Sequence, residues 1–318
     1  MFGSAWYLHI HFIFCEILQT IDKYCKLRII YCILIHEAVM KMSYKIIGDS
    51  CTDLPEEKYS DSHYTIVPLT ILFGQDEIPD DETLDQGTLL EKMREWPDAP
   101  KTACPSPAQY MDRFDDDADN YVVTLSGNLS GSYNAAVQAL DLYKQEGGKG
   151  NVHIFNSRSA SSGQAQIAML VQDLAEKGFA FDEVVAKVES YISRMQTLFV
   201  LENLENLRKN GRLTKMQSIV TGALRVKLLC AATREGEIEK LTQGLTVRQT
   251  LVKMVNRIAE DAEHVGRRLV LSHCNCRERA EYVRDMIRER CNFSEIHIVN
   301  TNGIATVYAN DGGIIAAY

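Results

Sequence analysis

The stretch VVTLSGNLSGSYNAA, residues 122–136, passes from an apolar segment through glycine and serine into a segment with helical spacing. Three kinds of chemistry suit such a loop: binding of a phosphate, activation of a serine nucleophile, or binding of another small anion. Each kind requires its own arrangement of residues. The spacing of Gly127, Ser130 and Gly131 therefore discriminates among them.

The first two alternatives lack their motifs in this loop. A nucleophile elbow requires G-x-S-x-G, but GNLSG has an additional residue between Gly127 and Ser130. A P-loop requires a lysine directly after its second glycine, and residues 122–136 contain no lysine. A dinucleotide-binding fingerprint also fails, because Gly127 and Gly131 are the only glycines of the loop.

A small anion is the remaining alternative. Ser126 follows a predicted strand, and open α/β sheets bind ligands at the carboxyl ends of their strands. Gly127 permits close approach of a ligand to the backbone, and a helix that begins near Ser130 offers free amide groups. Because no lysine or arginine lies in the loop, a carboxylate fits better than a polyphosphate. The alternative for Ser130 is an ordinary helix N-cap.

Hydroxyl groups recur after several predicted strands. In the loops GDSCTDLP, KTACPSP and NSRSASSG they belong to Ser50, Thr102, Ser106, Ser157, Ser161 and Ser162. Histidine does not recur in this way, so nothing in the sequence assembles a Ser-His-Asp triad. The HCNC stretch that begins at His273 lacks the spacing of a four-ligand zinc site. We therefore expect no metal site.

The elements that position these loops alternate along the chain from Tyr44 onward. Short apolar strands followed by amphipathic helices predict an α/β fold with a parallel sheet covered by helices. We predict two domains: an N-terminal α/β domain over residues 42–162 and a C-terminal mixed α/β domain over residues 163–318. A turn at Glu235 and Gly236 joins a predicted strand pair in the second domain.

Residues 1–41 differ from the rest in their richness in Ile, Phe, Tyr, Cys and His. Charged residues interrupt their apolar stretches, and a basic leader region with a small-residue cleavage site is missing. Two interpretations remain: a membrane anchor, or an upstream extension that precedes a true start at Met42. We favour the extension and expect no stable membrane insertion.

Composition limits the classes of partner and the compartment. The chain of 318 residues has a formal net charge of -9, which argues against nucleic acid as the main partner. Its nine cysteines are scattered without a disulfide framework. This usage fits a reducing cytoplasm.

Taken together and in order, these loops resemble those of the DegV family of bacterial fatty-acid-binding proteins. The matching stretches are GDSCTDLP, KTACPSP, LSGNLSGSYNAA, FNSRSASSGQA, LENLRKNGRL and the glycine-bearing end. The resemblance covers residues 44–318. It implies a two-domain α/β protein that buries a long-chain fatty acid in an apolar tunnel and has no catalytic residues or cofactor of its own. It also implies a partner, a separate ATP-binding fatty acid kinase subunit that phosphorylates the presented carboxylate.

The resemblance implies roles for individual residues. Thr102 and Ser126 correspond to the hydroxyls that hold the carboxylate, with Gly127 beside them. Ser50 and Asn310 are candidate supporting groups.

Further positions concern the partner and the departures from the family pattern. Arg248 corresponds to the arginine that docks the kinase subunit, and Arg212 is either a residue of the family motif or a turn-stabilising charge. Gly127 replaces a second serine that many relatives have, and Ala309 lies at or beside a histidine position. The missing imidazole puts phosphate handling in doubt more than acid binding.

Two functions of other classes stay open. One is a stand-alone hydrolase or transferase that uses Ser126. The other is a lipid carrier or sensor whose partner is not a kinase, an alternative that the missing histidine favours.

Overall fold

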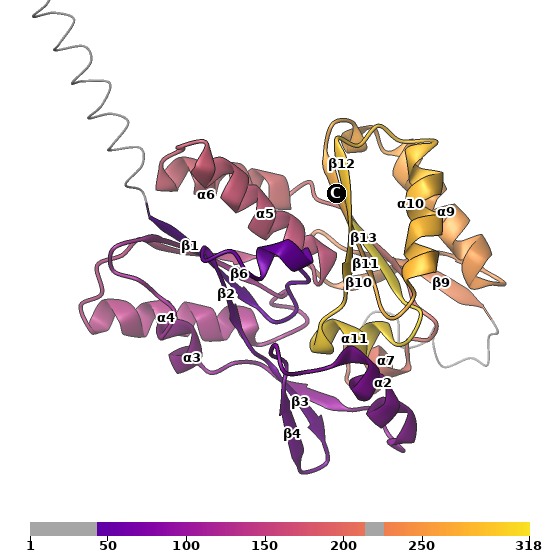
Figure 1. Ribbon diagram of the computed structural model, residues 1–318, viewed down its shortest axis with the longest axis horizontal. Coiled ribbons are helices and arrows are strands. Elements are labelled where there is room, and N and C mark those ends of the chain that lie inside the picture. Colours follow the sequence, from indigo (N-terminus) through magenta and orange to yellow (C-terminus); the bar gives the residue numbers. More distant parts are fainter. Residues whose placement is uncertain (1–42, 214–225) are drawn as a thin grey trace, which may run out of the picture. The chain divides into compact units, whose positions relative to one another are not determined.

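The computed structural model describes residues 43–213 and 226–318. Residues 44–318 form one compact unit, built from three sheets with helices packed against them (Figure 1). The two interpretations of residues 1–41 lie outside the described residues. No helix in the described part of the chain has the length and apolar character needed to cross a membrane.

The first sheet is parallel throughout and has the strand order β2-β1-β6-β7. Its strands are β1 (Tyr44–Asp49), β2 (Tyr64–Val67), β6 (Asp119–Thr124) and β7 (Val152–Asn156). One face packs against α3 (Pro107–Met111) and α4 (Ser132–Gln145), and the other against α5 (Ser162–Glu176) and α6 (Phe181–Ile192). The predicted parallel sheet covered by helices is confirmed (Figure 1).

Side-chain alternation explains why both faces of this sheet are covered. Ile46 of β1 belongs to the apolar cluster on the α5 side, whereas its neighbour Ile47 belongs to the cluster on the α4 side. Tyr121 and Val122 of β6 divide in the same way. Successive strand residues point to opposite faces, so these apolar runs require helices on both.

The second sheet is mixed, with the order β10-β9-β8-β13-β11-β12. Its strands are β8 (Thr197–Val200), β9 (Lys227–Ala232), β10 (Ile238–Gly244), β11 (Arg268–His273), β12 (Glu295–Asn300) and β13 (Ile314–Ala317). Only the β11–β12 pair among these is parallel. The predicted mixed architecture of the second half is thus confirmed.

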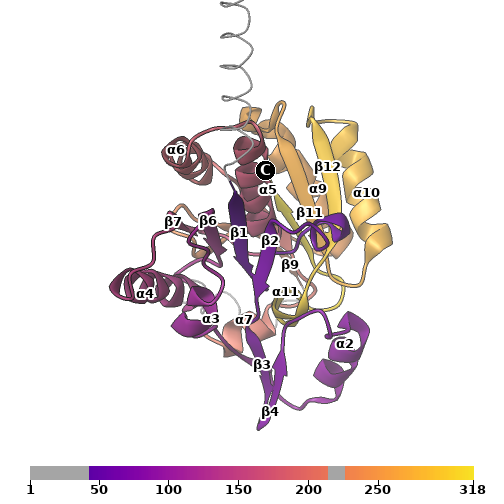
Figure 2. The same ribbon diagram turned by 60° about the vertical axis from the view of Figure 1, so that its left-hand side comes forward.

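Helix α5 lies between the first and second sheets. One apolar cluster joins Ala168 of α5 to Tyr121 of the first sheet and to Val270 and Val299 of the second. On the far side of the second sheet lie α9 (Val247–Glu260), the short 3-10 helix Ala262–His264, and α10 (Arg277–Arg288) (Figure 2). The predicted domain boundary after residue 162 falls at the start of α5 and stays a prediction.

A third, antiparallel sheet has the order β4-β3-β5. It consists of β3 (Thr70–Phe73), β4 (Asp76–Pro79) and β5 (Lys101–Ala103), and the short 3-10 helix Glu56–Lys58 precedes it in the chain. The apolar run YTIVPLTILFG, residues 64–74, predicts one extended stretch, but the structure divides it into the separate strands β2 and β3. Pro68 lies between them and has no amide hydrogen for a continuous ladder.

Three further helices lie within residues 43–213 and 226–318. They are α2 (Gln86–Glu95), α7 (Glu205–Lys209) and α11 (Gly303–Ala309). Residues of α2, α11 and β3 share one apolar cluster, which includes Leu89, Ile304 and Ile71. This cluster brings β5, and with it Thr102, close to α11.

Candidate functional site

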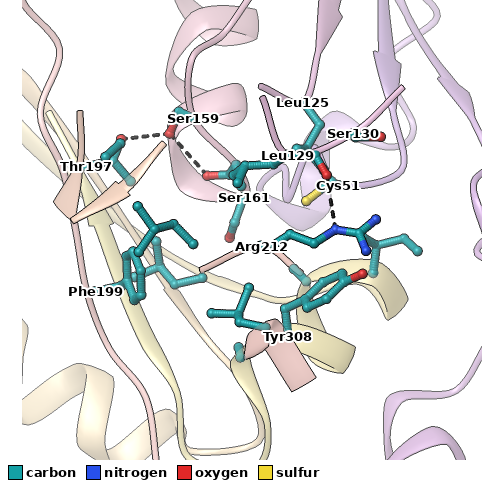
Figure 3. A pocket seen from close by; sticks show the side chains of 18 of the residues that line it. Cys51, Leu125, Leu129, Ser130, Ser159, Ser161, Thr197, Phe199, Arg212 and Tyr308 are labelled. Atoms are coloured by element: carbon teal, nitrogen blue, oxygen red, sulfur yellow. Dashed lines mark hydrogen bonds between the residues drawn. The ribbon is translucent and has the colours of Figure 1, made fainter. Parts of the chain in front are cut away.

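An apolar cavity lies where the loops after β1, β6 and β7 face the second sheet (Figure 3). Its empty space, including the mouth, measures about 820 Å³. Cys51, Leu125 and Ser161 line it from the loops, and Phe199 and Ile238 line it from the second sheet. The cavity therefore lies at the carboxyl ends of the parallel strands, the usual place for a ligand in such sheets.

Most of the cavity wall is aliphatic or aromatic. The apolar side chains are those of Leu69, Leu125, Leu129, Ala160, Phe199, Leu201, Leu207, Ala232, Ile238, Ile304, Ala305, Ala309 and Ile315. Such a wall gains free energy when it removes hydrocarbon from water. It offers little to a polar or multiply charged molecule.

One corner of the cavity is polar. The Thr102 hydroxyl lies 2.7 Å from the Tyr308 hydroxyl, and the Arg212 guanidinium lies 5.7 Å from the centre of the Tyr308 ring. Arg212 also donates from Nε to the carbonyl of Leu129 at 3.2 Å (Figure 3). Burial raises the pKa of Tyr308, which keeps its hydroxyl neutral and able to donate. We call Thr102, Arg212 and Tyr308 the hydroxyl–guanidinium corner.

This corner suits a single carboxylate. Each of its two hydroxyls carries one hydrogen, so both can donate to a carboxylate once their mutual hydrogen bond is released, and the guanidinium supplies the compensating positive charge. Charge-assisted hydrogen bonds of this kind contribute roughly 1.5–3 kcal/mol each. Ser130 lines the cavity nearby, where its hydroxyl lies 3.0 Å from that of Ser132.

A second group of hydroxyls lies on the other side of the view in Figure 3. Ser159 Oγ is 2.7 Å from Thr197 Oγ1, and both residues line the cavity. Ser161 donates its hydroxyl hydrogen to the carboxyl group of Asp53. The backbone of Ser161 has a φ of 56°, a conformation that is uncommon for residues other than glycine. Its neighbours must therefore hold it in place.

Buried acids behind the cavity fix the loops that form it. Asp53 accepts the Asn302 amide at 2.7 Å, and burial raises its pKa to about 8. Asp49 accepts the Leu125 amide at 2.7 Å, and burial raises its pKa to about 6. Asp80 receives two amides at the start of α11, and burial raises its pKa to about 6. Each acid thus ties one segment of the cavity wall to the rest of the fold.

The predicted site residues separate into different surroundings. Thr102 lines the cavity. Ser126 is fully buried, and its hydroxyl donates to the carbonyl of Gly236 at 2.7 Å. The Gly127 amide donates to Asn156 Oδ1 at 3.2 Å. The head-group roles of Ser126 and Gly127 therefore stay predictions, because the part of their loop that lines the cavity is Leu125, Leu129 and Ser130.

The two supporting candidates also have partners within the protein. Ser50 Oγ accepts the Leu69 amide at 3.1 Å. Asn310 Oδ1 accepts from Asn206 at 3.2 Å, and Asn310 lines a separate hollow beside α2 and α7. Their supporting roles stay predictions. Ala309, at the predicted histidine position, does line the cavity.

Tyr308 was not among the site residues predicted from the sequence, and Arg212 was predicted with two alternative roles. Ile304, Ala305 and Tyr308 have the spacing of one helical face, and all three line the cavity. That spacing was the available signal for Tyr308. The role of Arg212 had no such signal, because it depends on the distant partners Leu129 and Tyr308.

Arg248 lies away from the cavity, on the exposed side of α9. Its Nε is 3.3 Å from the Tyr282 hydroxyl, and its guanidinium lies 5.2 Å from the Tyr282 ring centre. The docking role of Arg248 stays a prediction. Cys274 and Cys276 of the HCNC stretch are free thiols. In residues 43–213 and 226–318, no three His, Cys, Asp or Glu side chains converge to hold a metal ion.

Comparison with known proteins identifies the family. The model of the DegV family, described as an uncharacterised protein family, matches residues 43–318. A DegV domain-containing protein from Streptococcus gordonii is 33% identical over 279 residues, which cover 87% of this chain and 99% of that protein.

Solved structures give the same result. A DegV-family protein from Ruminococcus gnavus, refined with vaccenic acid, is 45% identical and has a TM-score of 0.84, over 87% of this chain and 100% of that one. The fatty acid kinase (Fak) B3 protein from Streptococcus pneumoniae, loaded with linoleic acid, is 31% identical with a TM-score of 0.80, over 87% and 99%. A DegV-family protein from Eubacterium eligens, loaded with heptadecanoic acid, is 27% identical with a TM-score of 0.79, over 86% and 99%. This chain belongs to the DegV family.

Proposed function

We propose that the protein binds one long-chain fatty acid and presents it to a separate ATP-dependent kinase subunit, without a cofactor of its own. The observation that best supports binding is the apolar cavity with its single hydroxyl–guanidinium corner. Three similar structures hold vaccenic, linoleic and heptadecanoic acid. The presenting role is supported by the likeness to the Fak B3 protein.

In this proposal the acyl chain and the carboxylate of the ligand contribute differently to binding. Each buried methylene contributes about 0.8 kcal/mol before ordering costs, so the acyl chain provides most of the affinity. The carboxylate accepts from the hydroxyls of Thr102 and Tyr308 and lies near the Arg212 guanidinium. This corner sets the direction of the chain, because it joins hydroxyl donors to a positive charge, whereas the Ser159 and Ser161 hydroxyls elsewhere in the wall already bond to Thr197 and Asp53.

Tyr308 directly precedes Ala309, which lies at or beside the position where many relatives have a histidine. Ala309 has no polar group, whereas the adjacent Tyr308 hydroxyl is 2.7 Å from Thr102. A neutral phenol can donate to a carboxylate but does not exchange protons near neutral pH as an imidazole does. We therefore expect tight acid binding that varies little between pH 6 and 8.

The decisive experiment is native mass spectrometry of the full chain purified from bacteria, followed by lipid extraction. We expect one bound acid of ordinary acyl mass per chain. A homogeneous ligand-free protein that also takes up neither added oleate nor palmitate would overturn the proposal.

Variants test the corner directly. Thr102→Val and Tyr308→Phe keep the shape of each side chain and remove one hydroxyl, so each should weaken oleate binding by roughly tenfold to 150-fold. Neither should weaken binding of oleyl alcohol to the same extent, because the alcohol lacks the charge. Tyr282→Phe is the matched control, since Tyr282 lies on α10 beside Arg248. Equal losses of affinity for oleate and for oleyl alcohol would contradict the placement of the carboxylate at this corner.

The presenting role has its own test. Arg248→Ala should slow phosphorylation of bound oleate by a fatty acid kinase subunit with ATP, while leaving the affinity for oleate unchanged. Arg113→Ala, another exposed arginine in the first half of the chain, is the control. Unchanged turnover with Arg248→Ala would remove this residue from the contact, and absence of turnover in the unmodified protein would favour the carrier or sensor alternative.

The hydrolase alternative gains no support from the surroundings of Ser126. Its hydroxyl donates to the Gly236 carbonyl and accepts the Asn128 amide at 3.3 Å. Both partners are backbone groups, and neither can act as a general base. Labelling of Ser126 by a fluorophosphonate would restore this alternative.

A further inference from the structure

The loop after β6 and the turn between β9 and β10 are joined by two side-chain hydrogen bonds. Ser126 Oγ donates to the carbonyl of Gly236 at 2.7 Å, and Asn128 Nδ2 donates to the carbonyl of Glu235 at 2.7 Å. Residues 126 and 236 are far apart in sequence, so these bonds connect the first half of the chain to the second. We call this pair of contacts the loop–turn contact.

The approach at this contact is close. Gly236 has a φ of +83°, and a Cβ atom added to it would lie 2.3 Å from Ser126 Oγ and 2.7 Å from the Cα of Arg158. Only glycine fits this space and this conformation without displacement. The turn is therefore in direct contact with the loops that follow β6 and β7.

Both partners of the contact belong to segments that line the cavity. Leu125, Leu129 and Ser130 flank Ser126 and Asn128, whereas Glu237 and Ile238 follow Gly236. A second, polar hollow lies on the other side of the turn and is lined by Arg158, Thr233, Arg234 and Glu235, among others. Thr197 and Ala232 line both the cavity and this hollow. Residues of the β9–β10 turn thus line both spaces, Glu237 the cavity and Thr233, Arg234 and Glu235 the polar hollow.

From this arrangement we propose that the loop–turn contact is a latch that controls exchange of the bound acid. When Ser126 and Asn128 release the turn, Glu237 and Ile238 move with it and the cavity opens toward the polar hollow. The acid leaves and enters through that opening. This inference rests on the proposed function, because it concerns the rate at which the fatty acid of that site exchanges.

A latch has a kinetic signature that a ligand contact lacks. Weakening it raises the frequency of opening, which accelerates uptake and release together and changes the equilibrium affinity little. Removing a hydrogen bond to the bound carboxylate accelerates release alone. Ser126 is a candidate for either role, but Asn128 is exposed and its side chain is bonded to Glu235 outside the cavity. Asn128 therefore discriminates between the two roles.

The test uses the full chain and stopped-flow fluorescence with cis-parinaric acid, both for uptake and for release into excess oleate. Ser126→Ala and Asn128→Ala should each accelerate uptake and release by roughly two- to tenfold, the loss of one neutral hydrogen bond. The dissociation constant should stay within about twofold. Gly236→Ala, which displaces the turn from the loops after β6 and β7, should accelerate uptake and release the most. Asn134→Ala, an exposed asparagine at the start of α4, is the matched control and should exchange at the unmodified rate.

Three results would overturn the latch. Release accelerated by Ser126→Ala with uptake unchanged would make Ser126 a head-group donor. Rates equal to those of the control in both Ser126→Ala and Asn128→Ala would show that the contact does not limit exchange. Failure of the unmodified protein to take up cis-parinaric acid would overturn the proposed function together with the latch. If Ser126→Ala does not fold, the exposed Asn128→Ala variant decides alone.

Discussion

Two serine-rich loops follow neighbouring strands of the first sheet, yet their hydroxyls have different partners. In the loop after β6, Ser126 points to the backbone of a distant turn. In the loop after β7, Ser159 and Ser161 line the cavity and bond to Thr197 and to the buried Asp53. A hydroxyl at the end of a strand therefore has no fixed role, and the element that meets it in the folded chain decides what it does.

The backbones of the two loops differ as well. Gly131, which caps α4, has an ordinary φ of -72°. The loop after β7 has two non-glycine residues with positive φ, Arg158 at 50° and Ser161 at 56°. Such conformations cost of order 1–3 kcal/mol each and persist only where surrounding contacts enforce them. We infer that the Asp53–Ser161 bond is one of those contacts.

The largest expected effect concerns Asp53. Asp53→Ala removes the acceptor of both the Ser161 hydroxyl and the Asn302 amide, and two buried donors without partners should lower the free energy of unfolding by about 3 kcal/mol. Ser126→Ala, in the other loop, should lower it by about 1 kcal/mol. Urea denaturation of both variants measures the difference. Equal losses would mean that the two loops are held alike.

The next effect is the pH dependence that Asp53 confers. Burial raises its pKa from 3.8 to about 8, so between these values the folded protein keeps a proton that the unfolded chain releases. The contribution of neutral Asp53 is complete at acid pH and is lost as the pH rises toward 8. As the pH rises, the free energy of unfolding of the unmodified protein should fall, relative to that of Asp53→Asn, by at most about 1.4 kcal/mol for each pH unit.

Melting temperatures of the two proteins from pH 5 to 8 test this dependence. Asp49 and Asp80 are present in both proteins, so the difference contains the titration of Asp53 together with its charge interactions with these two acids. Parallel curves would show that Asp53 is already ionised in the folded state.

A smaller effect compares two glycines. A Cβ on Gly163, at the start of α5, would lie 2.0 Å from Ser159 Oγ and 2.6 Å from Ser159 Cβ, whereas one on Gly127 would lie no nearer than 3.2 Å to Asn156. Gly163→Ala should therefore lower the free energy of unfolding by about 2 kcal/mol through overpacking. Gly127→Ala should change it by less than about 0.5 kcal/mol. Thermal unfolding of the two variants ranks them, and a reversed order would contradict the packing argument.

The smallest effect is the coupling between Ser159 and Thr197. Their hydroxyls are 2.7 Å apart, so a double-mutant cycle with Ser159→Ala and Thr197→Val should give a coupling energy of about 1 kcal/mol. The same cycle with Ser126→Ala and Thr197→Val should give none. Coupling in the second cycle would mean that the two loops share one hydrogen-bond network.

Much of the fold followed from local pattern. Helix α9 has buried residues at positions 251, 254, 255 and 258, the spacing of an amphipathic helix, and Thr246 caps it as its side chain suggests. The stretch EIHIVN, in which Ile296 and Ile298 alternate with other residues as in a strand, forms β12. Strands β5 and β13 escaped prediction, because a three- or four-residue strand gains its pairing only from distant neighbours such as β3 and β11.

The candidate site, like the fold, was predictable from the sequence only where it depends on local pattern. That the loops after the parallel strands would gather at one edge of the first sheet was predictable from topology. Thr102 was expected in a loop after a strand, but it lies within β5 of the antiparallel sheet and lines the cavity from there. The orientation of the Ser126 hydroxyl was not predictable, because its partner Gly236 is set by the packing of the second sheet. The position of Arg212 above Tyr308 depends on two segments that meet only in the folded chain.

Helix α5 has a consequence for how the chain can be divided. Its side chains join the apolar clusters of the first and second sheets, and its Gln166 donates to the carbonyl of Ala317 at 3.1 Å. A gene cut before residue 163 would leave the first sheet without the cover of α5. If the chain were divided after residue 176, the second sheet would lack α5. The two halves should therefore unfold in one cooperative step, and separately expressed halves should be soluble only when they are produced together.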